Sequence, residues 1–164
     1  MNEKKNKTFE EIFKLALKNH KNNNFKLAEQ FYTECLKINS RSVDAHNNLG
    51  ILFNQLGKFQ QSITCYEKAI KINPDYIPLY NNLGFTFNKL GKYKNAINCY
   101  EKALQIKPND ADALYNLANT FKELGELKKA INFYENVLKI NPNYLGAYNN
   151  LGNTFKDLEE YTKA

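Results

Sequence analysis

The chain has 164 residues, which suits one ordinary folding unit better than two. Its 43% hydrophobic and 24% charged residues exclude an intrinsically disordered or fibrous protein. No apolar run approaches the length of a membrane span, and residues 1–9 lack the apolar stretch of a secretory signal, so we expect no membrane partner.

The net charge is +6, from 23 basic and 17 acidic residues, and Arg41 is the only arginine. The basic excess is therefore almost entirely lysine. Arginine supplies the planar fork that specific recognition of phosphates and bases usually needs. We expect no specific nucleic-acid partner, only weak and salt-sensitive binding.

After a lysine-rich lead-in at residues 1–8, apolar residues recur at helical spacing along the rest of the chain. Residues 45–56 form one such stripe, and the glycine at position 57 is expected to end that helix. Residues 59–72 form a second stripe, which stops before Pro74 because the residue preceding a proline avoids the α region. No comparable stretch alternates apolar and polar residues, so the sequence predicts helices joined by short turns.

The pattern returns every 34 residues. Each period carries a leucine, an aromatic residue one turn later, a glycine after the first helix and a proline after the second. These series are Leu49, Leu83, Leu117 and Leu151, then Phe53, Phe87, Phe121 and Phe155, then Gly57, Gly91 and Gly125, then Pro74, Pro108 and Pro142. The chain thus divides into repeats at residues 9–42, 43–76, 77–110 and 111–144, with a partial repeat at 145–164.

A single helix pair is too small to bury its apolar stripe, so neighbouring pairs are expected to stack. Two slots in the period hold small residues, as close helix contacts require. They are filled by Gly50, Gly84, Ala118 and Gly152, and by Ala28, Ser62, Ala96, Ala130 and Ala164. In the first repeat Asn23 replaces the turn glycine, and we expect it to adopt the left-handed conformation that asparagine tolerates.

This pattern resembles the tetratricopeptide repeat (TPR) family over all but the first eight residues. The resemblance implies an all-α fold, a right-handed α-solenoid of antiparallel helix pairs with four full repeats and a truncated fifth. It also implies a concave groove, lined by the first helix of each pair, that takes a protein or peptide partner. The fifth repeat breaks off at Ala164, in the middle of what should be its second helix, so we expect a fragment of a longer array and self-association through the uncapped C-terminal end.

Residue types that carry catalysis or hold metals are few and scattered. His20 and His46 lie in different repeats, and the three cysteines show neither Cys-x-x-Cys nor another metal-ligand spacing. The glycines follow the repeat rather than a phosphate-binding pattern. We expect no catalytic residue, metal or cofactor, and reduced thiols in a cytoplasmic or nuclear compartment.

Asparagines recur one residue before the repeated leucines, where the resemblance places them on the groove face. An asparagine offers one acceptor and two donors, so a row of them can pair with the backbone of an extended peptide. The candidate peptide-binding residues are Asn48, Asn82, Asn116 and Asn150, flanked by Asn119, Asn153, Asn47, Asn81 and Asn149. Asparagine is abundant throughout the chain, so the alternative is that the row reflects composition alone.

Two functions remain open. The first is a protein-protein interaction scaffold that binds an extended or helical partner segment. The alternative is the substrate-recruiting portion of a larger glycosyltransferase with its catalytic domain outside this chain, because the asparagine row resembles that of O-linked N-acetylglucosamine transferases. A carboxylate clamp for chaperone tails does not fit, because Asn47 and Asn81 fall where a clamp lysine belongs.

Overall fold

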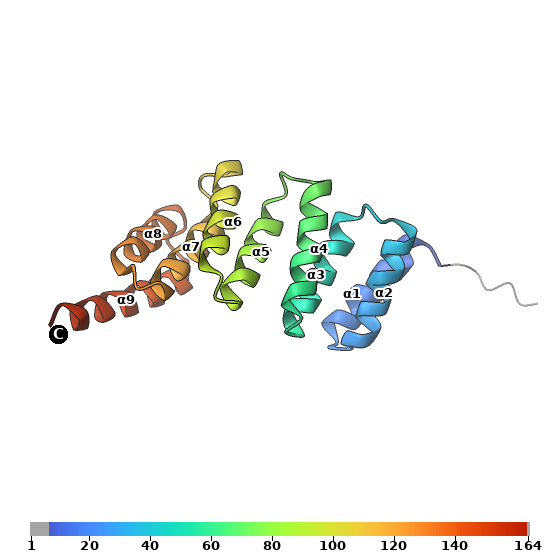
Figure 1. Cartoon of the computed structure of the whole chain (residues 1–164), viewed down its shortest axis with the longest axis horizontal. Coiled ribbons are helices and arrows are strands. Elements are labelled where there is room, and N and C mark those ends of the chain that lie inside the picture. The colour runs from blue at the N-terminus through green and yellow to red at the C-terminus, as the bar shows by residue number, and fades with distance from the viewer. Residues whose placement is uncertain (1–6, 164) are drawn as a thin grey trace, which may run out of the picture. The chain divides into compact units, whose positions relative to one another are not determined.

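The computed structural model describes residues 7–163, with side chains as far as Glu159. All regular secondary structure in this range is helical, which confirms the predicted all-α class. The chain forms two compact units, residues 1–79 and 80–164, and residues 1–6 of the predicted lead-in lie outside the described part. The helices are α1 (Phe9–Lys21), α2 (Phe25–Ile38), α3 (Val43–Gln55), α4 (Phe59–Ile72), α5 (Ile77–Lys89), α6 (Tyr93–Ile106), α7 (Ala111–Glu123), α8 (Leu127–Ile140) and α9 (Leu145–Lys163) (Figure 1).

The first unit stacks its helices in chain order. Helix α1 packs on α2, α2 on α3, and α3 on α4, so each helix pair covers the next. The core between them contains the fully buried Ala28, Tyr32 and Leu52. Stacking therefore buries the apolar stripe that one pair alone would leave in water.

The second unit repeats this arrangement. Helix α6 packs on α7, α7 on α8, and α8 on α9. Tyr100 and Ala96 are fully buried with Leu117 in one cluster, and Tyr134 and Ala118 belong to the next. Each unit is thus a stack of helix pairs of the solenoid type, as the repeat predicts.

The turn inside each full repeat has a left-handed residue at the same position. The φ angles are +70° at Gly57, +67° at Gly91 and +74° at Gly125, and Asn23 has a φ of +60° in the first repeat. Glycine adopts this conformation without steric cost and asparagine at a small one. The predicted left-handed Asn23 is confirmed.

The small residues of the first helices allow a tyrosine of the following helix to lie against the backbone. A Cβ atom added to Gly50 would lie 2.6 Å from Tyr66 Cε1, and one added to Gly84 would lie 2.6 Å from Tyr100 Cε1. Both distances are far below van der Waals contact. The other small slot is also closed, because Ala28, Ser62, Ala96 and Ala130 are fully buried; Ala164 lies outside the described residues.

Helix α9 departs from the predicted pattern. The sequence places a turn near residue 159 and a second helix from about Tyr161, whereas α9 continues without interruption to Lys163. Position 159 holds a glutamate where the full repeats have a left-handed glycine or asparagine. Glutamate adopts that conformation far less readily than glycine or asparagine, which favours a continued helix at this position.

Candidate functional site

The asparagine row of the second unit lies along three first helices. Its members occupy equivalent, half-buried positions on α5, α7 and α9, and in each case the backbone carbonyl accepts a hydrogen bond from a buried threonine one turn later. The pairs are Asn82 with Thr86 at 2.8 Å, Asn116 with Thr120 at 2.8 Å and Asn150 with Thr154 at 2.6 Å. We call these asparagines, with the flanking Asn81, Asn119, Asn149 and Asn153, the amide face.

The asparagines of the first unit lie on α3. Asn48 is half-buried, and its side-chain amide donates a 2.8 Å hydrogen bond to the carbonyl of Asp44, one turn earlier in the same helix. Asn47 beside it is also half-buried. Both residues therefore lie at the helix surface. The side-chain amide of Asn48 is hydrogen-bonded within its own helix.

The members of the amide face differ in what their side chains contact. Asn81 Nδ2 donates to Asp110 Oδ1 at 3.3 Å, and that carboxylate also caps the first turn of α7 through the backbone amide of Ala113. Asn149 and Asn153 are exposed on α9 and Asn116 is half-buried on α7. Among the described residues, no side-chain hydrogen bond is made by these last three.

Asn119 and Asn150 form an internal hydrogen-bond network instead. Asn150 Nδ2 donates to Asn119 Oδ1 at 2.8 Å and to Tyr115 Oη at 3.0 Å. The hydroxyl of Tyr134 donates to the same Asn119 oxygen at 2.6 Å. These bonds use both amide hydrogens of Asn150 and two acceptor positions of Asn119, so the network joins α7, α8 and α9.

Further contacts hold α9, and Tyr144 just before it, against α7. The ring of Tyr144 lies 4.9 Å from that of Tyr115, and its hydroxyl donates to Asp112 Oδ1 at 3.0 Å. Lys122 pairs with Asp157 at 3.1 Å. Burial, followed by the hydrogen bond to Asp112, raises the pKa of Tyr144, and burial raises the pKa of Tyr134 to about 12. Both phenols therefore stay neutral near pH 7.

This network was missed in the sequence, although it leaves a signal there. Tyr115 occupies the slot held by Asn47, Asn81 and Asn149 in the other repeats. One turn later, Asn119 replaces the Ile51 and Phe85 of the preceding repeats. The two departures fall in the same repeat, and the structure brings both residues to Asn150.

First helices are also joined to one another by polar side chains. In the first unit His20 Nε2 donates to Gln55 Oε1 at 2.8 Å, which links α1 to α3. In the second unit Asn88 Nδ2 donates to Thr120 Oγ1 at 2.8 Å and to Tyr100 Oη at 3.3 Å, which links α5 to α7 and α6. These bonds fix the spacing of neighbouring first helices within each unit.

His46 is a packing residue of the first unit. It is 7% exposed on α3, and its Nε2 lies 3.0 Å from the carbonyl oxygen of Ser40, so Nε2 carries the proton. The buried Nδ1 has no hydrogen-bond partner among the described residues. Burial lowers the pKa of His46, the Ser40 carbonyl partly opposes this and Lys68 adds to it.

We expect the first unit to lose stability as the pH falls below about 6.5, the ordinary pKa of an unfolded histidine. The unfolded chain then takes up a proton that the folded His46 resists, so acid favours unfolding by at most about 1.4 kcal/mol per pH unit. Leu114 fills the equivalent slot in α7, which makes His46→Leu the matched variant. The urea midpoint should change less between about pH 7.5 and 5.5 in His46→Leu than in the parent chain. An equal change in both chains would show that His46 is not the source of the acid sensitivity.

Cysteines and acidic residues do not gather into a metal site in the described part of the chain. Cys35, Cys65 and Cys99 are buried thiols that form no disulfide within the described residues, and burial raises the pKa of Cys35 and, to about 11, that of Cys65. Protonated, buried thiols of this kind behave as small apolar packing residues. Of the helices in the described range, none has the length and apolar character of a bilayer span.

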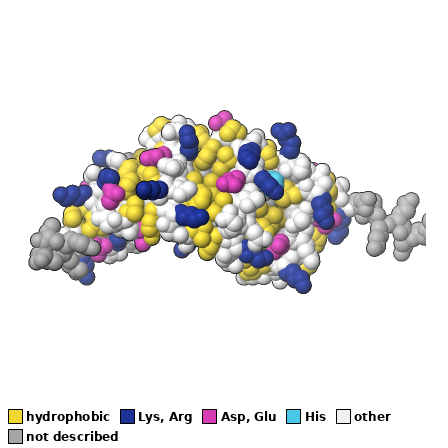
Figure 2. Space-filling view, in the orientation of Figure 1, with side chains coloured by type: hydrophobic (Ala, Val, Ile, Leu, Met, Phe, Trp, Pro, Cys, Tyr) yellow, Lys and Arg dark blue, Asp and Glu magenta, His cyan; other side chains and the backbone are white. Residues whose placement is uncertain are grey.

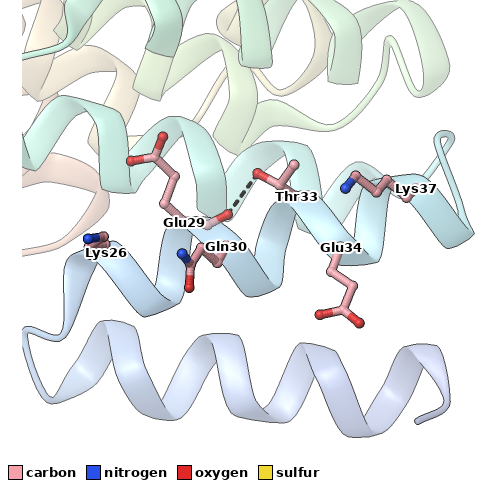
Figure 3. Close-up of a pocket in the computed structure, with 6 residues that line it drawn as sticks. All are labelled: Lys26, Glu29, Gln30, Thr33, Glu34 and Lys37. Atoms are coloured by element: carbon pink, nitrogen blue, oxygen red, sulfur yellow. Dashed lines mark hydrogen bonds between the residues drawn. The ribbon is translucent and has the colours of Figure 1, made fainter. Parts of the chain in front are cut away.

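A shallow hollow lies along α2 in the first unit (Figure 3). It is lined by Lys26, Glu29, Gln30, Thr33, Glu34 and Lys37. Thr33 Oγ1 donates to the carbonyl of Glu29 in the same helix at 2.7 Å, and the charged side chains point in different directions rather than toward a common centre (Figure 3). Glu29 is also paired with Lys58 at 3.1 Å. These side chains have the arrangement of a hydrated helix surface.

The lysines are dispersed. On the face seen in Figure 2, lysine and arginine side chains alternate with acidic, uncharged and hydrophobic surface. Several lysines lie over aromatic rings, such as Lys89 over Phe85 at 5.2 Å and Lys129 over Phe121 at 5.1 Å. The visible face therefore lacks the single continuous basic stripe typical of nucleic-acid-binding proteins.

Comparison with protein families gives several overlapping matches. A model described as "Tetratricopeptide repeat" matches residues 43–76 and 111–144, another with the same description matches residues 65–98, and one described as "TPR repeat" matches residues 86–125. The matches together run from residue 43 to residue 144. A comparison with curated proteins gives no match.

Solved structures with the same fold include several of MamA. A crystal structure of MamA protein is 24% identical and has a TM-score of 0.79, covering 90% of this chain and 81% of that one. MamA residues 41 to the end from Desulfovibrio magneticus RS-1 is 19% identical with a TM-score of 0.82, covering 94% and 88%. At these identities the similarity is one of fold.

Proposed function

Because the chain belongs to the tetratricopeptide repeat family, we propose that it is a protein-interaction scaffold whose amide face binds an extended or helical partner segment. The observation that carries the proposal is the set of amides on α7 and α9 left open to a ligand. Asn116, Asn149 and Asn153 hydrogen-bond no other described side chain, so each offers two donors and an acceptor.

An extended peptide presents a backbone donor and acceptor at every non-proline residue, and amide side chains can pair with both. Asn116 and Asn153 lie on successive first helices, so a segment crossing these helices meets one amide and then the next. Such hydrogen bonds recognise the backbone of the partner rather than its side chains. Selectivity then comes from neighbouring groups, such as the 45% exposed ring of Phe85 and Lys89 above it.

The internally bonded asparagines support binding in another way. Asn119 and Asn150 are held by three hydrogen bonds to each other and to Tyr115 and Tyr134. A surface fixed before binding loses less conformational freedom when the ligand arrives. The network therefore positions α7 and α9, and through them the open amides, for the partner.

The test is a double variant, Asn116→Ala with Asn153→Ala, assayed against peptides selected from a phage-displayed library of unstructured sequences. The loss of two hydrogen bonds at about 0.5–1.5 kcal/mol each predicts an affinity roughly 5- to 150-fold weaker. Helicity and melting temperature should change little, because Asn153 is exposed and the Asn116 side chain is bonded to no described residue.

The matched control is Asn98→Ala with Asn132→Ala. These two asparagines are exposed at equivalent positions on the second helices α6 and α8. Peptide affinity should stay at the parent level in this control. If the two double variants bound the peptide with equal affinity, the amide face would not be the binding surface.

The glycosyltransferase alternative concerns residues outside this chain. No contact among the described residues favours it over a scaffold that acts alone, and both functions would use the same peptide-binding face. The scaffold is therefore the function proposed for these residues.

A further inference from the structure

An aromatic ring continues the amide face of the second unit onto α5. The slot two residues after the repeated leucine holds Asn119 on α7 and Asn153 on α9, whereas on α5 it holds Phe85. The Phe85 side chain is 45% exposed. Aromatic side chains are enriched in protein interfaces, so this ring offers an apolar contact next to the open amides.

The exposure of this slot belongs to the fold. Leu17 fills the same slot on α1 of the other unit and is 40% exposed. On α5 the residue before Phe85 is Gly84, and a Cβ added there would lie 2.6 Å from Cε1 of the fully buried Tyr100. The buried side of α5 is thus filled by the Tyr100 ring, which leaves the Phe85 ring on the outer surface.

Hydrogen bonds hold α5 in place beside α7. Asn88 Nδ2, one turn after Phe85, donates to Thr120 Oγ1 at 2.8 Å and to Tyr100 Oη at 3.3 Å. Asn81, one turn before Phe85, donates to Asp110 Oδ1 at 3.3 Å. The ring is therefore fixed relative to the amides of α7 before any partner binds, which lowers the entropy cost of binding.

Lys89 places an unpaired positive charge at this ring. Its Nζ lies 5.2 Å from the centroid of the Phe85 ring, close enough for a cation–π contact. The Lys89 side chain is exposed and forms no ion pair within the part of the chain that the structure describes.

The acidic side chains nearest in the repeat do not neutralise Lys89. Asp110 caps α7 and pairs with Lys107, and Asp112 accepts a hydrogen bond from Tyr144. Glu123 occupies the slot of Lys89 one repeat later, where it is exposed and unpaired with Lys89. A carboxylate on a partner would therefore find an available counter-ion at Lys89.

We propose that the partner segment carries an aromatic or aliphatic residue that packs on Phe85 and, beside it, an aspartate or glutamate that pairs with Lys89. Equivalent slots on packed helices are about 10 Å apart, the span of about three extended residues. The backbone bonded to Asn116 thus lies about three residues from this acidic apolar anchor. The inference rests on the proposed function, because it assigns side-chain selectivity to the same binding face.

The test compares two variants against peptides selected on the parent chain from a phage-displayed library of unstructured sequences. Phe85→Asn and Lys89→Glu each introduce the residue that α7 carries at the same slot, so the helix should tolerate both. The selected peptides should share an apolar residue next to an acidic one. Phe85→Asn should weaken their binding at least tenfold, and Lys89→Glu roughly three- to tenfold, more at low salt.

A charge swap tests the ion pair directly. Replacing the acidic residue of the selected peptide by lysine should weaken its binding to the parent chain and strengthen its binding to Lys89→Glu. The controls are Lys94→Glu, which makes the same change in net charge on α6, and Ile106→Asn, which removes a 37% exposed apolar side chain from that helix. Both controls should bind the selected peptides as the parent does.

The outcomes separate this inference from the scaffold itself. Parent-like binding by Phe85→Asn and Lys89→Glu, with affinity lost in Asn116→Ala with Asn153→Ala, would overturn the anchor and leave the amide face as the binding surface. Selected peptides with lysine or arginine beside the apolar residue would also contradict the anchor. If no peptide bound, or if none of these variants lost affinity, the proposed function would fall together with the anchor.

Discussion

Gly84→Leu should unfold the second unit locally, whereas Gly152→Leu should leave its fold intact. The two glycines occupy the same slot of the repeat, on α5 and α9. A side chain at Gly84 meets the ring of the fully buried Tyr100, with Cε1 at 2.6 Å and Cζ at 2.7 Å from the first carbon. Overpacking of a closed core costs about 1–3 kcal/mol or more, and here the obstacle is a buried ring.

At Gly152 a leucine meets open space, and replacing a helical glycine gains up to about 1 kcal/mol in helix propensity. Urea unfolding followed by circular dichroism should therefore give a lower midpoint for Gly84→Leu and an equal or higher one for Gly152→Leu. A similar fall in the urea midpoint of both variants would show that the close contact with Tyr100 is not what excludes a side chain at position 84.

Tyr134→Ala should destabilise the second unit by about 3–5 kcal/mol, the range for removing a large aromatic side chain from a core. Tyr134 is fully buried on α8, and the same cluster contains Ala118 of α7 and Ala147 of α9. Removing the ring opens a cavity between three helices. Hydrogen exchange should accelerate in α9 and α7, while residues 7–79 should keep their protection.

Tyr134→Phe separates packing from hydrogen bonding at the same position. It keeps the ring and removes the hydroxyl that donates to Asn119 at 2.6 Å, while Asn150 still donates to the same oxygen. The expected cost is about 1 kcal/mol, because the remaining acceptor stays satisfied. If Tyr134→Phe were as damaging as Tyr134→Ala, the hydrogen-bond network rather than the packed ring would hold α9.

The sequence predicts well what depends on the period. The helix ends before Gly57 and Pro74 and the left-handed Asn23 follow from local conformational preference. The small residues Ala28, Ser62, Ala96 and Ala130 are buried as the period predicts, whereas Gly152 is exposed. Such features need no knowledge of which side chains meet. They are fixed by backbone sterics and by the requirement that each helix pair cover the next.

The sequence predicts poorly what depends on individual side-chain contacts. Nothing in the period distinguishes Asn116, which is open, from Asn150, whose two amide hydrogens are bonded to Tyr115 and Asn119. That difference arises because Tyr115 and Asn119 both depart from the residues that the preceding repeats carry at these two positions. Each departure alone resembles ordinary variation between repeats. The continuation of α9 to Lys163 was not predicted for a similar reason, since the only change at the turn position is the single residue Glu159.

The most direct test of the scaffold is the side-chain amide spectrum of the labelled chain during titration with a phage-selected peptide. The account predicts that the NH₂ resonances of Asn116 and Asn153 shift in proportion to saturation, while those of Asn98 and Asn132 on the second helices stay in place. Shifts confined to Asn98 and Asn132, with Asn116 and Asn153 unmoved, would place the partner on the opposite helices and contradict it.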